Sequence, residues 1–197
     1  MTALERSVDA VVIGTSAGGV EALMVLLPAL PATLRAAVLV VIHLPRERPS
    51  LLVEIFAPRC ARPVREAQDK EPVEPGCVYF APPDYHLLVD EGADGRPSLA
   101  LSADPLVNFS RPSIDVLFES AADVYGPRLL GIVMTGGNQD GAAGLAAVAR
   151  RGGLTAVQRP DTAAVSWMPD SALKALKSGE PDHLLPLDGL AALLRGL

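Results

Sequence analysis

The sequence predicts an α/β fold built on a mostly parallel sheet with one small antiparallel hairpin. Two early runs rich in β-branched residues, 9–14 and 37–43, do not alternate apolar with polar side chains. Such runs are typical of strands that are buried on both faces of a parallel sheet. A glycine-rich turn and an apolar helical segment, 19–30, connect them, so strand, helix and strand follow one another as in a βαβ unit.

The second half of the chain repeats this plan. Residues 129–135 form a further apolar run, which leads into another glycine-rich turn and an alanine-rich helix over 141–151. Residues 153–158 are predicted to be the next strand, and residues 113–125 the helix that precedes residue 129. Strands that alternate with helices in this way favour one α/β sheet.

An antiparallel hairpin is predicted between the two halves. Residues 86–90 and 98–102 alternate apolar with polar side chains and flank the turn-forming segment 92–97. We expect this hairpin to lie inside the otherwise parallel sheet. No linker rich in Pro, Gly or Ser divides the 197 residues and no repeat is visible, so residues 1–197 are expected to form one domain.

The composition argues against several classes of protein. Seventeen Lys and Arg against 23 Asp and Glu give a net charge of −6, with no basic block for nucleic acid or an anionic membrane. No apolar run reaches the roughly 18 residues that a membrane-spanning helix needs, and no secretory signal is visible. Cys60 and Cys77 lack metal-binding spacing, so we expect two reduced thiols in the cytoplasm and neither a metal ion nor a cofactor.

The first candidate catalytic residue is Ser16, which follows the first predicted strand. The segment Gly14-Thr-Ser-Ala-Gly18 has the G-x-S-x-G spacing of a nucleophile elbow. Glycines on both sides let the chain turn sharply, and the unpaired N–H groups of the helix that follows can stabilise an oxyanion. The same turn could equally bind a phosphate or serve only as a tight connection.

His43 and Asp140 also follow predicted strands. Since parallel strands end at the same edge of a sheet, His43 is expected to emerge beside Ser16, which favours a general base. Asp140 could be no more than an N-cap for the helix 141–151, or it could orient the histidine. Three side chains suited to a triad at one edge are a stronger signal together than any of them alone.

Several alternatives are open at this point. Ser16, Asp140 and His183 would follow the residue order of α/β-hydrolases, although His183 lies in a polar turn near the C-terminus. A Ser16–Asp140 dyad would leave His43 idle. His86 is expected in the hairpin, and Arg111 is expected to be a solvated residue. In a non-catalytic binding domain, the glycine-rich turn would hold only an anion.

The ordered motifs resemble the catalytic domain of the CheB-type protein-glutamate methylesterases. The principal motifs are Ile13-Gly-Thr-Ser-Ala-Gly-Gly19, Ile42-His-Leu-Pro45 and the segment 135–141. Supporting stretches lie at 81–88, 111–118, 157–169 and 184–190, so the resemblance extends from about residue 9 to 195.

The resemblance implies a doubly wound α/β domain with helices on both faces of the sheet. It also implies that Ser16 is the nucleophile, His43 the general base and Asp140 the orienting carboxylate. Backbone N–H groups of Ala17 and of the Gly136-Gly137 turn are then expected to hold the oxyanion.

The family hydrolyses methyl esters of glutamate side chains on cytoplasmic helices of chemoreceptors in chemotaxis signalling. It releases methanol and often deamidates receptor glutamines. The expected partners are therefore methylated chemoreceptor helices, with no membrane insertion. The open alternative is a serine esterase or amidase that acts on another protein or on a small ester.

The chain departs from the family pattern in two respects. Gly137 and Asn138 replace the usual Met-Gly pair, and Ala17 stands where many members have threonine. Most members also carry an N-terminal phospho-receiver domain. Because the esterase motifs begin at about residue 9, no receiver domain is expected within these residues. The sequence is then either an excised domain or a stand-alone member, and a stand-alone member would be unregulated by phosphorylation in cis or controlled by a separate partner.

Overall fold

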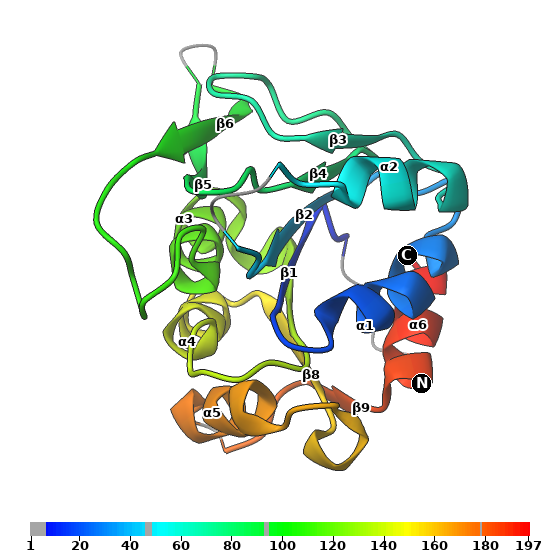
Figure 1. Cartoon of the computed structure of the whole chain (residues 1–197), viewed down its shortest axis with the longest axis vertical. Coiled ribbons are helices and arrows are strands. Elements are labelled where there is room, and N and C mark those ends of the chain that lie inside the picture. The colour runs from blue at the N-terminus through cyan, green and yellow to red at the C-terminus, as the bar shows by residue number, and fades with distance from the viewer. Residues whose placement is uncertain (1–6, 46–48, 93–94, 178) are drawn as a thin grey trace.

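The computed structural model describes residues 7–45, 49–92, 95–177 and 179–197. Its centre is a parallel sheet of seven strands in the order β3-β4-β2-β1-β7-β8-β9 (Figure 1). The strands of this sheet are β1 (Ala10–Thr15), β2 (Ala37–Ile42), β3 (Val64–Glu66), β4 (Val78–Phe80), β7 (Leu129–Val133), β8 (Leu154–Gln158) and β9 (His183–Leu185). The helices are α1 (Gly19–Leu26), α2 (Leu52–Phe56), α3 (Ile114–Tyr125), α4 (Ala142–Arg150), α5 (Trp167–Ala175) and α6 (Leu187–Arg195).

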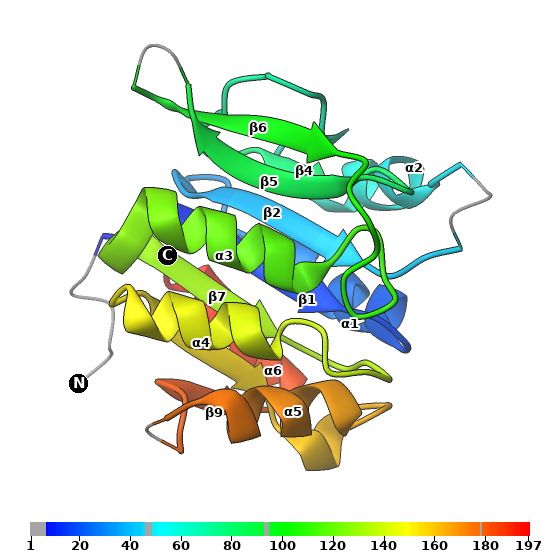
Figure 2. The same ribbon diagram turned by 90° about the vertical axis from the view of Figure 1, so that its left-hand side faces the viewer.

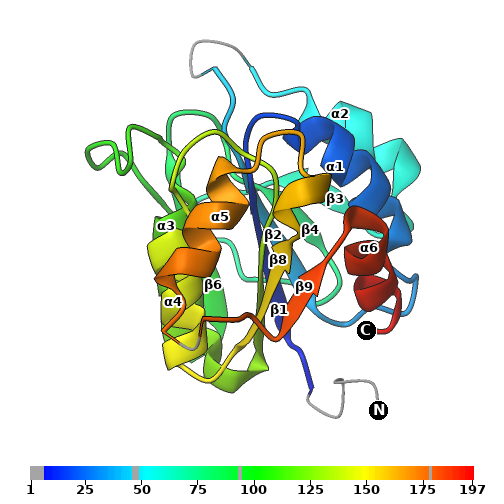
Figure 3. The same cartoon turned by 90° about the horizontal axis from the view of Figure 1, so that it is seen from below.

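Helices cover both faces of the sheet, as the doubly wound prediction requires. In Figure 3, α3, α4 and α5 lie on one side of the strands and α1 and α6 on the other. Consecutive residues of one strand therefore point into the core on opposite faces of the sheet. Val12 packs in the buried cluster that includes residues of α3, α4 and α5, and Val11 and Ile13 pack in the cluster that includes residues of α1 and α6. Every residue of β1 is buried, because a strand covered on both sides has no face left for polar residues.

The predicted hairpin exists, but its predicted place inside the main sheet is wrong. The strands β5 (His86–Glu91) and β6 (Pro97–Ser102) form a separate two-stranded sheet (Figure 2). Leu87 and Val89 belong to the same buried cluster as residues of α3, and the Val89 N–H donates to Ser120 Oγ of that helix at 3.1 Å. One buried face explains the alternating pattern. Residues 93 and 94, in the predicted turn, lie outside the described residues.

The strand order creates a crevice at the carboxyl edge of the sheet. The chain leaves β1 towards β2 on one side, whereas β7 pairs with β1 on the other side. At such a switch point the loops that follow neighbouring strands diverge, and ligands of α/β proteins bind there. Thr15 pairs with Ile42 and Gly14 with Val133, so the residues that follow these strands meet at this edge. Within the described ranges no helix is both long and apolar enough to cross a membrane.

Candidate active site

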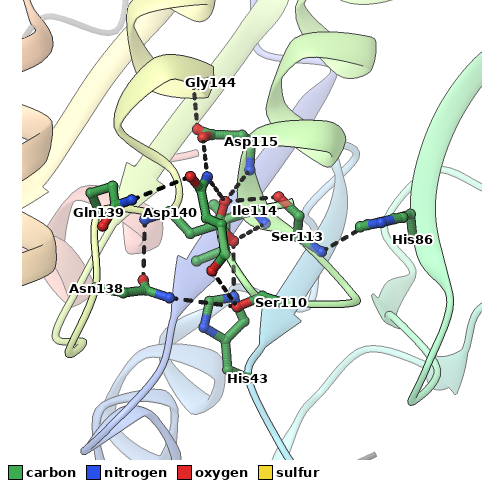
Figure 4. A network of polar contacts seen from close by, with 11 residues as sticks. His43, His86, Ser110, Ser113, Ile114, Asp115, Asn138, Gln139, Asp140 and Gly144 are labelled. Carbon is green, nitrogen blue, oxygen red and sulfur yellow. Dashed lines mark hydrogen bonds and ion pairs between the residues drawn. The ribbon is translucent and has the colours of Figure 1, made fainter. Parts of the chain in front are cut away.

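His43 and Asp140 form a hydrogen-bonded pair at the carboxyl edge of the sheet. The Nε2 atom of His43, just after β2, lies 2.9 Å from Oδ2 of Asp140, in the loop between β7 and α4 (Figure 4). The Asp140 side chain is fully buried, whereas 14% of the His43 side chain is exposed. One ring nitrogen therefore bonds a buried carboxylate, while the ring itself can still be reached from the crevice.

The Asp140 carboxylate also closes the N-terminus of α3. Its Oδ2 accepts the N–H of Ile114 at 2.6 Å, and its Oδ1 accepts the N–H of Asp115 at 3.2 Å and the hydroxyl of Ser113 at 2.7 Å. The alternative that Asp140 caps the helix that follows it is wrong: the N-cap of α4 is Gly141, with no side-chain hydrogen bond. Asp140 is held instead at the positive end of a helix from another part of the chain.

These contacts decide the charge of Asp140. Burial alone would raise the pKa of this carboxyl group, because an ion is less stable away from water. Hydrogen bonds from His43, from the Ile114 N–H, from Asn108 and from Ser113 outweigh burial and hold the pKa below its usual value. Asp140 is therefore ionised at neutral pH, as a carboxylate that orients a histidine must be.

Ser16 lies in the turn between β1 and α1, next to His43. Its N–H donates to the carbonyl of Thr135 at 3.0 Å, and its carbonyl accepts the N–H of Gly19 at 2.8 Å. The His43 N–H in turn donates to the Thr15 carbonyl at 3.2 Å, which fixes the two segments side by side. Within the described part of the chain the Ser16 hydroxyl makes no hydrogen bond, and neither does Nδ1 of His43. Catalytic hydrogen bonds are often loose before substrate binds.

The turn after β7 offers one free backbone donor to an oxyanion. The Gly136 N–H already donates to the Val165 carbonyl at 3.0 Å. Gly137 is exposed, and its N–H has no backbone acceptor among the described residues. The same is true of Ala17, just after Ser16. Of the three N–H groups expected at this position, those of Ala17 and Gly137 are therefore available.

Thr135 joins the two turns that carry these donors. Its hydroxyl donates to the Ala17 carbonyl at 2.8 Å and accepts the Val165 N–H at 2.9 Å. The Thr135 carbonyl accepts the Thr15 hydroxyl at 2.8 Å as well as the Ser16 N–H. The turn after β1 and the turn after β7 are thus held in a fixed relative position.

Comparison with known proteins identifies the family. The family model of the CheB methylesterase matches residues 11–194. The chain belongs to the CheB methylesterase family. Its fold is also that of a crystal structure of the Thermotoga maritima CheB methylesterase catalytic domain, with a TM-score of 0.87 and 32% sequence identity over 95% of this chain and 100% of that one.

Curated CheB-family relatives agree with this assignment. A Leptospira interrogans protein, provisionally named protein-glutamate methylesterase/protein-glutamine glutaminase, is 41% identical over 185 residues, which cover 94% of this chain and 92% of the relative. A protein-glutamate methylesterase/protein-glutamine glutaminase of Caulobacter vibrioides is 39% identical over 181 residues, or 92% of this chain and 51% of that protein.

This CheB-family site contains a buried carboxylate and an amide that the sequence analysis did not single out. Asn108 Nδ2 donates to Asp140 Oδ1 at 2.9 Å and to Asp115 Oδ2 at 2.8 Å, so it lies between two acids. The other oxygen of Asp115 accepts the Gly144 N–H at 2.7 Å. Burial, with the charge of Asp140 as a smaller cause, raises the pKa of Asp115 to about 6. Partners this distant in sequence leave no signal in a single chain, although Ser113 is the first residue of the helix predicted over 113–125.

The remaining two histidines do not contact Asp140 or Ser16 among the described residues. His86, in the hairpin as predicted, is buried; its Nε2 lies 3.1 Å from the Pro105 carbonyl and its Nδ1 accepts the Ser113 N–H at 3.1 Å. His183 was expected in a turn, but it begins strand β9 and pairs with Ala156. Two strands, β7 and β8, separate β9 from β1, so His183 cannot join Ser16.

Arg111 is not a solvated residue, contrary to expectation. Its guanidinium donates to Asp84 Oδ1 at 2.8 and 3.1 Å and to the carbonyls of Ala103 and Asp104 at 2.7 and 2.9 Å. These bonds hold the connection between β6 and α3 against the loop that contains Asp84.

Proposed function

We propose that this protein is a protein-glutamate methylesterase that uses Ser16 as nucleophile, His43 as general base and Asp140 as orienting carboxylate. The observation that carries the proposal is the His43–Asp140 pair, 2.9 Å apart and with a buried carboxylate, at the same sheet edge as Ser16. A Ser16–Asp140 dyad would leave this pair without a purpose, and a simple anion-binding turn would not need it.

The mechanism follows from the geometry of the imidazole. Since Nε2 faces the Asp140 carboxylate, we assign the ring proton to Nε2 and the free lone pair to Nδ1. His43 Nδ1 accepts the proton of Ser16 Oγ as this oxygen attacks the ester carbonyl. The buried negative charge of Asp140 stabilises the imidazolium that forms.

The tetrahedral intermediate needs donors for its oxygen. Ala17 and Gly137 supply N–H groups at the two turns that Thr135 joins. His43 then donates its Nδ1 proton to the departing methoxide, and methanol leaves. Water attacks the acyl-enzyme with His43 as base, so that Ser16 regains its proton and a glutamate carboxylate is released. A receptor glutamine would follow the same path with ammonia as the leaving group.

The substrate proposed is the methylated cytoplasmic helix of a chemoreceptor. The support is membership of the CheB family and relatives that are named for both activities. The proposal places the reaction in the cytoplasm, in agreement with the free thiols of Cys60 and Cys77. A serine esterase acting on another protein or on a small ester is the alternative that experiment must separate.

The proposal is tested by methanol release from methylated receptor membranes. The wild type is compared with Ser16→Ala and His43→Gln, and circular dichroism checks that each variant folds. Loss of release by several orders of magnitude in both folded variants is the expected result. If the wild type releases no methanol but a fluorophosphonate labels Ser16, the protein is a serine hydrolase with a different substrate. Absence of both reactions contradicts the proposal.

A further inference from the structure

A tight turn next to the candidate active site contains a phenylalanine in an unfavourable backbone conformation. The Val107 N–H donates to the Ser110 carbonyl at 3.1 Å, and the Ser110 N–H donates to the Val107 carbonyl at 2.9 Å. The two residues between them, Asn108 and Phe109, have φ angles of 50° and 62°. Positive φ at both central residues is the mark of a type I′ turn, for which Asn-Gly is the preferred pair. Phe109 thus occupies the position where glycine is favoured, and a bulky residue there is strained.

The Phe109 side chain gains almost nothing from folding. It is 93% exposed, so the ring leaves hardly any apolar surface protected from water. Phe109 therefore strains its backbone and adds no buried apolar contact in return. The stability of the fold does not explain why a phenylalanine is present here. Strain of this kind persists chiefly at binding and catalytic sites.

The position of Phe109 connects it with the catalytic residues. Phe109, His43 and Leu44 line the same cavity of about 150 Å³. Asn108, directly before Phe109, bonds Asp140, and Arg111, shortly after it, bonds Asp84 and two carbonyl groups. The turn is therefore fixed at both ends, and it lies in the connection that projects from the fold between β6 and α3 (Figure 3). A backbone held so firmly loses little conformational entropy when a partner covers the Phe109 ring.

We propose that Phe109 is a substrate-recognition residue, which packs against an apolar side chain of the protein that carries the esterified glutamate. The inference rests on the proposed function, because it assigns the contact to the substrate of the same site. The cavity beside His43 has room for little more than a single side chain. Since the ring is open to solvent, the group that covers it must belong to a chain that extends beyond the cavity. A protein segment meets this requirement and a small ester does not.

The first test measures binding separately from catalysis. The dissociation constant of a methylated receptor cytoplasmic fragment is measured for Ser16→Ala and for Ser16→Ala with Phe109→Ala, so that turnover plays no part. We expect the second substitution to weaken binding about tenfold, as truncation of an exposed aromatic anchor does. Phe109→Leu should restore most of the affinity. Leu184→Ala is the matched control, because Leu184 is an exposed apolar residue on the edge strand β9 and should leave binding unchanged.

The second test uses the active enzyme. Phe109→Ala should raise KM for the methylated receptor fragment about tenfold, with a much smaller effect on the hydrolysis of p-nitrophenyl acetate, which has no flanking chain. Phe109→Gly should show the same KM defect without a lower melting temperature, since glycine accepts a positive φ. Equal affinity of the two binding variants, or equal loss on both substrates, would overturn the inference. Inactivity of the wild type in the methanol assay would count against the proposed function alone, since the binding test does not depend on turnover.

Discussion

Asp140 closes the N-terminus of α3 at Ile114, which precedes it by 26 residues, and the same carboxylate oxygen bonds His43. The helix end and the imidazole therefore share one oxygen atom. Two backbone N–H groups and the Ser113 hydroxyl fix the carboxylate in place, so the direction in which it presents its charge to the ring is set by α3.

Replacing Asp140 by asparagine tests whether the negative charge of the carboxylate is needed, because the size of the side chain stays the same. The amide keeps the size of the carboxylate but not its charge, and it can present an N–H to His43 Nε2 and stabilise the wrong tautomer. We expect kcat to fall by about 10³- to 10⁴-fold. Loss of the anion at the N-terminus of α3 should also cost about 1 kcal/mol of stability. Steady-state kinetics and urea unfolding measure the two effects, and a loss of activity below tenfold would contradict the assigned role.

Asp115 should make the protein less stable as the pH rises from about 4 to about 6. Its pKa is raised to about 6 in the folded protein, mainly by burial, so the folded state holds the proton more tightly than the unfolded chain does. The associated loss of stability across this window is about 3 kcal/mol. Asp140 acts in the opposite direction, because its pKa is lowered: its contribution is lost only as the pH falls below its ordinary value near 3.8.

The measurement is urea unfolding of the wild type and Asp115→Asn at several pH values. The unfolding free energy of the wild type should fall relative to that of Asp115→Asn as the pH rises from 4 to 6. Comparing the two proteins removes the contribution of other carboxyl groups. A difference that does not vary with pH would show that Asp115 titrates normally.

Asn108 should stabilise the folded protein, because it supplies one N–H to each of two buried acids. Asn108→Gly retains a residue that accepts a positive φ but removes the amide, and the loss of hydrogen bonds to charged groups should cost about 2 to 3 kcal/mol. Asn108→Asp should be worse, since it places a third carboxyl group beside the other two. Thermal unfolding tests the order, and an aspartate variant as stable as the wild type would contradict this account.

Gly136 and Gly137 are adjacent but should respond differently to alanine. A Cβ at Gly136 would lie 2.5 Å from Met168 Cε, whereas a Cβ at Gly137 would have no atom within 4 Å. Gly136→Ala should therefore destabilise the protein by about 1 to 3 kcal/mol. Gly137→Ala should change the free energy of unfolding by less than about 0.5 kcal/mol. Chemical unfolding of both variants is the measurement, and equal stability would mean that Met168 moves aside at little cost.

The strands that position Ser16 and His43 are correctly predicted from the sequence. Continuous apolar runs predicted β1, β2 and β7, and the residues after β1 and β2 meet because the register pairs Thr15 with Ile42. The short strands β3, β4 and β9 have three residues each, which is too few for a periodic pattern. Alternation in β5 and β6 indicated one buried face but not that α3 would cover it.

The hydrogen-bond partners of Asp140 could not be predicted from the sequence. Its hydrogen bonds to Ser113, Ile114 and Asn108 join segments that are 26 to 32 residues apart, and only the packing of α3 against the loop before α4 brings them together. Likewise, nothing in the pattern around Gly136 shows that its N–H is taken by Val165. The roles of Ser16, His43 and Asp140 remain predictions until they are tested chemically.

The most direct test is fluorophosphonate labelling followed by mass spectrometry of the peptides. The account predicts one adduct, on the peptide that contains Ser16, with a labelling rate that falls by at least 100-fold in folded His43→Gln, on the order expected when a general base is lost. The Ser16→Ala variant should not be labelled. An adduct on another serine, or methanol release by a Ser16→Ala protein, would contradict the assignment of Ser16 as the nucleophile.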